Sequence, residues 1–345
     1  MIKKVTIKNL AEAANVSIGT VDRALNDRIG ISKKTKAKIL DKAKELGYEV
    51  NRVAQSLSRR PLRIGCILPG NSNYFYPQVE AGIIEAKNFL IDYNVSISCK
   101  KTENLNFQQE IQYINEFIEE GIDGLAICPG HRTKMNSVIN KVVDSGIPVV
   151  TFSSDAPESK RTTCVGTDSF NNGQIVGDLM TNFIDHKGKI AIITGCSSMT
   201  DQQEKVKGFM EVINSYPNSI ELIGVYETLE DPKIIYDKVK KIVENTPNLK
   251  GIFFTAANSI YGCKALIDLG MQYKVKVITP DLCAEQIPYI ENGIIRAIIH
   301  QHPYSQGYKA IKILYDILTT NKSYGPNDYI KPDIILKHNL KYFIK

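Results

Sequence analysis

The sequence lacks any apolar run long enough to cross a membrane, because no stretch approaches the roughly 18 consecutive apolar residues that a spanning helix needs. Its first residues, MIKKVTIKNLAEAANVS, also lack the continuous apolar core of a signal peptide. We therefore expect a cytoplasmic protein with no membrane partner.

Metal-binding patterns are also sparse. The 7 cysteines are scattered without a C-x-x-C pair, and several lie in apolar runs such as IGCIL and LAICP. This distribution is typical of reduced, buried thiols in a cytosolic protein and argues against a structural zinc site. His300 and His302 form an H-x-H motif, but no third ligand is evident in the sequence. We expect neither a metal nor any other cofactor.

Three motifs that carry common enzyme chemistry are missing. The sequence has no G-x-x-x-x-G-K-[ST] phosphate loop, no G-x-G-x-x-G after a strand-like run and no G-x-S-x-G nucleophile elbow. With these signals absent, we expect a protein that is not an enzyme.

Positive charge is unevenly distributed along the 345 residues, whose formal net charge is +6. Residues 1–60 contain fourteen Lys and Arg against six Asp and Glu, whereas the remaining 285 contain twenty-nine against thirty-one. A net charge of +8 in the first sixth of the chain indicates a polyanionic partner for that segment.

The first 60 residues contain the helix start and stop signals expected of a small helical bundle. Thr6, Ser17 and Ser32 are each placed to cap the start of a short amphipathic helix, and Gly47 follows the last one. This spacing predicts three helices of about 8 to 14 residues around a thin core.

Beyond Pro61 the pattern changes to apolar, strand-like runs that alternate with amphipathic helical segments at intervals of about 25 to 30 residues. Such spacing is typical of βαβ units with buried parallel strands. Two successive series predict an α/β fold with two doubly wound lobes, whose ligand binds between them, beyond the carboxyl ends of the strands. The strand-like runs are residues 63–68, 95–99, 124–129, 148–152, 189–194, 220–226, 250–255 and 275–279.

The N-terminal segment TIKNLAEAANVSIGTVDRALN, followed by ISKKTKAKILDKAKELGYEVNRVAQSLS, resembles the lactose-repressor/galactose-repressor (LacI/GalR) family of bacterial transcription regulators. The shared motifs are V-S-x-x-T-V-x-R-x-L-N, S-x-x-T-x-x-x-I-x-x-x-A-x-x-L-G-Y and N-x-x-A-x-x-L. The resemblance implies a helix-turn-helix headpiece over residues 1–50, a hinge helix and linker over 51–61, and an effector-binding and dimerisation domain over 62–345.

In the headpiece, the resemblance implies that the second helix enters the major groove with the residues near its start facing base edges. Arg23 suits a paired contact with guanine or a phosphate contact, and Leu57 of the hinge is expected to wedge into a minor-groove step. Asp22 replaces the small polar residue of most members. Positions 18 and 19 lack the larger polar side chains that usually contact bases, so the operator sequence cannot be inferred from relatives. The expected DNA-binding residues are Thr6, Ser17, Ile18, Gly19, Thr20, Asp22, Arg23, Asn26, Asn51, Arg52 and Leu57.

The rest of the chain resembles the type I periplasmic sugar-binding proteins, in segments such as NSNYFYPQVEAG, VVTFSSDAP and VGTDSFNNGQIVGDLM. The resemblance implies a first lobe over about residues 62–154 and 303–326 and a second over about 155–301 and 327–345. Carboxylate and amide side chains at strand ends bind sugar hydroxyls, while aromatic rings cover the apolar faces of the sugar. The expected effector-binding residues are Asn73, Phe75, Tyr76, Ser154, Asp155, Gln203, Asn258, Asp281 and Gln301.

Two departures from this family bear on the effector. Ser153 and Ser154 stand where ribose-type binders have an Asp-Arg pair, and Gln203 stands where relatives often have Arg. The loss of two guanidinium groups argues against an anionic ligand, so a neutral sugar or polyol is expected. Each Asp or Asn at a strand end has a simpler interpretation as a helix cap, and only their joint placement favours a binding site.

Together these features predict a transcription regulator of the bacterial nucleoid that binds a pseudo-palindromic double-stranded operator as a homodimer and responds to a small-molecule effector. The C-terminal segment KHNLKYFIK adds no heptad-like helix, so a dimer is expected rather than a tetramer. Two alternatives stay open: a cytosolic sugar-binding or sensor protein without specific DNA binding, and a sugar-processing enzyme.

Overall fold

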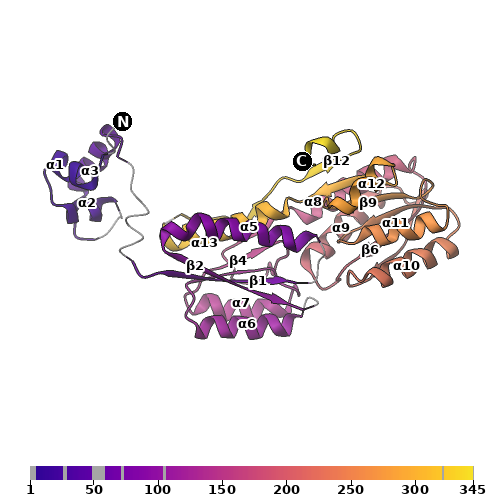
Figure 1. Ribbon diagram of the computed structural model, residues 1–345, viewed down its shortest axis with the longest axis horizontal. Helices are drawn as coiled ribbons and strands as arrows, with labels where there is room; N and C mark the ends of the chain where they lie inside the picture. The colour runs from indigo at the N-terminus through magenta and orange to yellow at the C-terminus, as the bar shows by residue number, and fades with distance from the viewer. Residues whose placement is uncertain are drawn as a thin grey trace. The chain divides into compact units, whose positions relative to one another are not determined.

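The computed structural model describes residues 5–25, 29–48, 59–70, 74–103, 106–320 and 322–344 (Figure 1). The chain divides into two compact units, Met1–Pro61 with Asp92–Asn94, and Leu62–Ile91 with Val95–Lys345. No helix within the described ranges is both long and apolar enough to cross a bilayer.

The first unit contains the predicted three-helix bundle. Thr6 caps the first helix by accepting a hydrogen bond from the Asn9 amide, and Ser32 caps the third by accepting one from the Thr35 amide. Small and branched apolar side chains from all three helices form one buried core. The helices are α1 (Ile7–Ala14), α2 (Ile18–Leu25) and α3 (Lys33–Glu45).

The first lobe of the second unit is a six-stranded parallel sheet in the order β11-β5-β4-β3-β1-β2. Figure 1 shows α5 and α13 on one face of this sheet and α6 and α7 on the other. The elements are β1 (Leu62–Pro69), α5 (Phe75–Leu90), β2 (Val95–Thr102), α6 (Phe107–Glu119), β3 (Gly124–Ile127), α7 (Lys134–Asp144), β4 (Val149–Phe152), β5 (Thr163–Gly166), α13 (Pro303–Thr319) and β11 (Asn327–Tyr329). The short helix η1 (Ile91–Tyr93) follows α5 along the chain.

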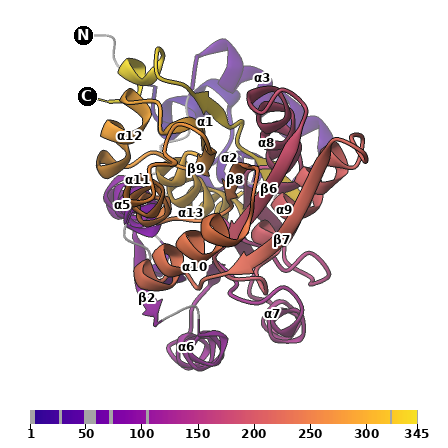
Figure 2. The same cartoon turned by 90° about the vertical axis from the view of Figure 1, so that its right-hand side faces the viewer.

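The second lobe is a six-stranded sheet in the order β12-β10-β9-β8-β6-β7, parallel except for β12. In Figure 2, α10 and α11 lie on one side of β6 and β8, and α8 and α9 lie on the other. The predicted fold class, a helical headpiece followed by two doubly wound lobes, is therefore confirmed. The elements are α8 (Ser169–Phe183), β6 (Gly188–Thr194), α9 (Thr200–Ile213), β7 (Ile220–Glu227), α10 (Pro232–Asn245), β8 (Leu249–Phe254), α11 (Ser259–Asp268), β9 (Lys276–Pro280), η2 (Ala284–Gln286), α12 (Ile287–Glu291), β10 (Ile295–His300), β12 (Asp333–Ile335) and η3 (Leu340–Tyr342).

The lobe boundaries differ from those expected at residues 154 and 326. Strands β5 and β11 pair with each other in the first sheet, so the first lobe extends to Gly166 and Tyr329. The chain consequently crosses between the lobes at residues 167–168, 301–302 and 330–332. Strands of four and three residues are too short for periodicity to reveal, which is why the sequence placed these crossings too early.

Glycines let the helix backbones of each lobe pack in direct contact. In the second lobe, a Cβ atom on Gly208 of α9 would collide with the backbone carbonyl of Phe170 in α8, and one on Gly173 of α8 would collide with that of Lys205. Gly82 of α5 and Gly307 of α13 have the same relation in the first lobe. These helices carry residues around the cleft, so their close packing sets the position of the site.

Gly208→Ala is expected to lower the free energy of unfolding by about 3 kcal/mol, because the added methyl group must separate two packed helices. Urea denaturation measures the change. Glu211→Ala, at an exposed position of the same helix, is the control and should change stability by less than about 0.5 kcal/mol. Equal stability of the two variants would show that the helix contact does not limit the fold.

Candidate functional site

Helix α2 presents an exposed face that starts at the turn before it. Val21 and Ala24 are buried in the bundle core, whereas Ser17, Gly19 and Arg23 are exposed. Ile18 is also exposed, with 48% of its surface accessible, although burial is usual for its side chain. This arrangement leaves the start of the helix open to a groove, as expected for a recognition helix.

Three other predicted DNA contacts have partners within the headpiece. The Ser17 hydroxyl accepts a hydrogen bond from the Thr20 amide at 3.1 Å and lies 2.8 Å from the Thr20 hydroxyl. The Thr6 hydroxyl donates to Asn9 Oδ1 at 2.7 Å within the cap of α1. Asp22 is half-buried. The remaining predicted contacts lie outside the described residues: Asn26, Asn51, Arg52 and Leu57.

The effector cleft contains a cavity, here called the inner cavity, lined from both lobes of the second unit. Its walls include residues that follow β1, β4, β8, β9 and β10, so the carboxyl ends of strands from both sheets surround it. Its volume is about 30 Å³. The lining residues are Phe75, Tyr76, Ser153, Asp201, Gln202, Lys205, Glu230, Thr255, Ala256, Ala257, Pro280, Asp281 and Gln301.

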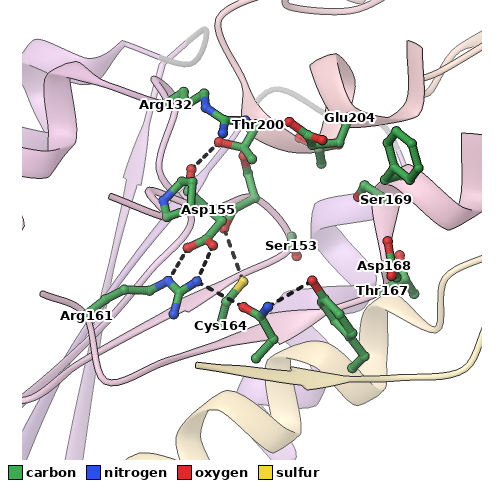
Figure 3. Close-up of a pocket in the computed structure, with 17 residues that line it drawn as sticks. Arg132, Ser153, Asp155, Arg161, Cys164, Thr167, Asp168, Ser169, Thr200 and Glu204 are labelled. Atoms are coloured by element: carbon green, nitrogen blue, oxygen red, sulfur yellow. Dashed lines mark hydrogen bonds and ion pairs between the residues drawn. The ribbon is translucent and has the colours of Figure 1, made fainter. Parts of the chain in front are cut away.

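A second pocket of about 230 Å³, here called the side pocket, shares Ser153 and Asp201 with the inner cavity (Figure 3). It borders the first crossing through Thr167 and Asp168. Four of its charged side chains form two ion pairs: Arg132 binds Glu204 at 2.7 Å and Arg161 binds Asp155. The side pocket is therefore held largely by internal ion pairs.

Four of the predicted effector residues lie together around the inner cavity. The rings of Phe75 and Tyr76 meet edge to face with centroids 5.1 Å apart. Across the cavity, Asp281 accepts hydrogen bonds from the Gln301 backbone amide at 2.8 Å and from its side-chain amide at 2.6 Å. The aromatic and hydrogen-bonding parts of the expected site are thus brought to one place.

Asp155 and Ser154 lie at the side pocket instead. Both carboxylate oxygens of Asp155 accept hydrogen bonds from Arg161, and one also accepts from the Thr151 hydroxyl and the Ala156 amide. Figure 3 shows the Asp155 carboxylate pointing at the Arg161 guanidinium. These contacts occupy the carboxylate, so they favour a structural role over the predicted contact with an effector.

Gln203, Asn258 and Asn73 complete the predicted set. Gln203 does not line the inner cavity, because its side-chain amide donates to the Ser197 carbonyl at 2.7 Å, and the neighbouring Gln202 lines it instead. The Asn258 side chain donates to the Glu230 carbonyl at 2.8 Å and supports the cavity wall from behind. Asn73 lies outside the described residues.

Sequence reasoning missed most of the polar residues contributed by the second lobe. Asp201, Gln202 and Lys205 come from one face of α9, while Glu230 follows β7 and Thr255 follows β8. Residues at positions i, i+1 and i+4 share one face of a helix, so this spacing is the sequence signal that could have identified Asp201, Gln202 and Lys205. Glu230 has no such signal, because it lies in an irregular connection.

Burial raises the pKa of two carboxyl groups that line the inner cavity, those of Glu230 and Asp281. Burial, assisted by repulsion from Asp201, raises the pKa of Glu230 to about 7, although Lys205 acts in the opposite direction. Burial also raises the pKa of Asp281, against the attraction of His300 and the hydrogen bonds from Gln301. Glu230 therefore exchanges its proton near neutral pH.

Backbone strain is concentrated at the same cavity. Ser153, Glu230 and Asp281 all have left-handed backbone conformations, with φ of 62°, 59° and 53°. Such conformations cost non-glycine residues on the order of 1 to 3 kcal/mol each and gather at ligand sites, where the surrounding structure holds them in place. The strain thus supports the inner cavity as the binding site.

Several contacts hold the lobes together across the cleft. Besides the ion pair of Arg132 with Glu204, the Ser198 hydroxyl of the second lobe donates to the Gly130 carbonyl of the first at 2.9 Å. The Tyr74 hydroxyl accepts a hydrogen bond from the Asn258 amide at 3.1 Å. Since the inner cavity is far smaller than the roughly 300 Å³ of typical ligand pockets, entry of a ligand requires these contacts or the lining side chains to move.

Two features define the class of this protein: a helix-turn-helix unit with an exposed recognition face, and a two-lobed unit with a polar cavity at strand ends. Residues 6–51 match the bacterial regulatory proteins of the lacI family, and residues 64–323 match the periplasmic binding protein domain family. The chain belongs to the LacI family of DNA-binding transcription regulators, with a periplasmic-binding-protein domain as its second unit. This confirms the resemblance seen in the sequence.

Individual relatives extend over nearly the whole chain. The HTH-type transcriptional regulator RegA of Clostridium saccharobutylicum is 28% identical over 339 residues, which cover 96% of this chain and 97% of that protein. Catabolite control protein A of Staphylococcus aureus (strain MRSA252) is 27% identical over 346 residues and 98% of each chain. The chain is thus similar to full-length regulators rather than to one of their domains.

Solved structures resemble the second unit. GanP, a glucose-galactose binding protein from Geobacillus stearothermophilus, has a TM-score of 0.75 and 25% identity over 82% of this chain and 99% of that one. An ABC transporter solute-binding protein from Burkholderia graminis C4D1M, solved with D-arabinose, has a TM-score of 0.77 and 23% identity over 83% and 99%. Both have the two-lobed fold described above.

Arg161→Met is expected to destabilise the protein by about 3 kcal/mol, because it leaves the Asp155 carboxylate buried without its cation. Thermal or urea unfolding measures the loss. Adding Asp155→Asn to this variant removes the isolated charge and should recover part of the stability. A cost below about 1 kcal/mol for the single variant would contradict the structural role of this ion pair.

Proposed function

We propose that this regulator binds a pseudo-palindromic operator as a homodimer, and that a small carbohydrate or polyol in the inner cavity controls its affinity for DNA. The observation that carries the proposal is the presence, in one chain, of an open recognition helix and of a strained polar cavity between two lobes. A protein that only binds DNA has no use for the cavity, and a protein that only stores a ligand has no use for the recognition helix. The expected site of action is the bacterial nucleoid.

The carbohydrate part of the proposal rests on the lining of the inner cavity. Asp281, Gln301 and Gln202 supply carboxylate and amide groups, and the Phe75 and Tyr76 rings supply apolar faces. That combination suits a small ring with several hydroxyl groups. The sugars named for the two solved structures are consistent with this class of ligand.

Control follows from the position of the cavity between the lobes. A ligand shifts the protein between two arrangements only by the difference between its affinities for them. A ligand that contacts both lobes binds two arrangements with different affinities if the angle between the lobes differs between them. In a symmetric dimer that angle sets the spacing of the two headpieces, which must match the two operator half-sites. We propose binding without turnover, because the matched families are regulators and binding proteins.

Arg23→Ala is expected to lower affinity for the operator by about 10- to 100-fold, because a good base contact is worth roughly 1 to 3 kcal/mol. Mobility shifts on a duplex selected from random DNA by the wild-type protein measure the affinity. Arg296→Ala removes the same charge from an exposed position in the second unit and is the control.

The same assay tests DNA binding as a whole. The logarithm of the wild-type binding constant should fall against the logarithm of salt concentration with a slope steeper than about −4. A slope near zero, or equal losses for the two arginine variants, would count against operator recognition by the headpiece.

Asp281→Asn is expected to abolish the response of operator binding to its effector while leaving operator affinity without effector within about twofold. The amide keeps the size of the side chain but turns a donor toward the Gln301 amide, so the pair that faces the ligand is disrupted. Mobility shifts with and without effector measure the response, and Glu291→Gln, exposed on α12, is the control. An unchanged response would remove Asp281 from the site.

A further inference from the structure

The inner cavity carries more negative than positive charge. Asp201, Glu230 and Asp281 line it, whereas Lys205 alone among its described lining residues is a cation. The Lys205 ammonium lies 3.1 Å from Asp201 Oδ2 and 3.2 Å from the Thr255 carbonyl, so it balances one carboxylate. At the side pocket, two of the four acidic lining residues are paired with arginines, Asp155 with Arg161 and Glu204 with Arg132.

Two carboxylate oxygens of the inner cavity are buried without a partner. Asp201 Oδ1 and Glu230 Oε2 have no hydrogen bond to any described residue. Glu230 is 91% buried, because 9% of its surface is accessible. Both oxygens of Asp281, in contrast, accept hydrogen bonds from Gln301. Both oxygens belong to residues that line the inner cavity, so a ligand bound there can supply the donors that they lack.

The backbone holds Glu230 in this position at a cost. Leu229 and Glu230 are consecutive non-glycine residues with φ of 51° and 59°. Asp231 then caps α10 by accepting a hydrogen bond from the Ile234 amide. The second lobe therefore turns sharply between β7 and α10 and sends a carboxyl group, rather than a neutral side chain, into the cavity.

We propose that the effector is an amino sugar whose ammonium group binds between Asp201 and Glu230. This inference rests on the proposed function and changes the expected charge of the ligand from neutral to positive. An ammonium group offers three donors for the two unpaired acceptors, and its positive charge favours the ionised form of Glu230 over the protonated one. A hydroxyl group in its place would satisfy an acceptor but leave the charge unbalanced.

The rest of the cavity suits the sugar part of such a ligand. Asp281, Gln301 and Gln202 remain for ring hydroxyl groups, while Phe75 and Tyr76 offer aromatic faces that also favour a nearby cation. The loss of guanidinium groups that argues against an anionic ligand argues equally for a cationic one. The carboxylates, the unpaired acceptors and the aromatic rings of the cavity thus all favour an amino sugar.

The test compares matched sugars on the full-length protein. The probes are D-glucosamine, D-galactosamine and D-mannosamine, each with its neutral parent hexose and its N-acetyl derivative. Titration calorimetry and thermal shift should show at least one free amine binding about tenfold or more tightly than its two neutral counterparts. That amine should also change operator affinity in the mobility-shift assay.

Variants assign the effect to the two carboxylates. Glu230→Gln should weaken binding of the amine by about tenfold or more and weaken binding of neutral hexoses by clearly less, because only the amine loses a charged partner. If Glu230→Gln does not fold, Asp201→Asn provides an independent test, and it should also weaken binding of the amine. Glu211→Gln, an exposed carboxylate on α9, is the charge-matched control and should bind like the wild type.

Each outcome decides the inference. If a neutral hexose binds as well as or better than its amine, the amino-sugar inference is wrong while the proposed carbohydrate effector stands. If the amine binds but both carboxylate variants retain its affinity, the placement between Asp201 and Glu230 is wrong. If no probe binds or alters operator affinity, the amino-sugar inference fails and the carbohydrate effector loses its support.

Discussion

The hydrogen bonds of Gln301 link the effector cavity to the hinge between the lobes. This residue lies in the second crossing, and its backbone and side-chain amides both donate to Asp281. Its side-chain oxygen accepts a hydrogen bond from Thr167 in the first crossing, and its carbonyl accepts one from Gln306 at the start of α13. The Gln306 side chain in turn accepts a hydrogen bond from the Ser153 hydroxyl at the cavity wall. Asp281 is therefore connected by hydrogen bonds to two of the crossings that join the lobes.

The cleft separates charge that stabilises the fold from charge that remains available to a ligand. At the side pocket, Arg161 pairs with Asp155 and Arg132 pairs with Glu204, so these groups hold the connections between strands and between lobes. At the inner cavity, Lys205 is the one cation among the described lining residues, and it cannot pair with all three acidic residues there. Buried charge without a partner is costly, which makes the inner cavity the part of the cleft where a bound molecule changes stability most.

Much of the architecture was predictable because it depends on local patterns. The caps at Thr6 and Ser32 and the long buried strands have periodicities and end signals that can be recognised in the sequence. Strands β5 and β11 were not predictable, because segments of a few residues join a sheet only when neighbouring strands are already in place. The family resemblance points to Gln203, whereas Gln202 lines the cavity, because the face that α9 turns toward the cleft depends on its packing against α8.

The amino-acid sequence by itself determined that a basic helix-turn-helix headpiece precedes two parallel-sheet lobes, and it pointed to Phe75, Tyr76, Asp281 and Gln301, which line one cavity. Only the tertiary structure decided which acidic side chains are neutralised. Asp155 pairs with Arg161 within the connection between β4 and β5, whereas Glu230 reaches the inner cavity through a left-handed turn. Pairing of charges depends on distances in space, and separation along the chain does not set those distances.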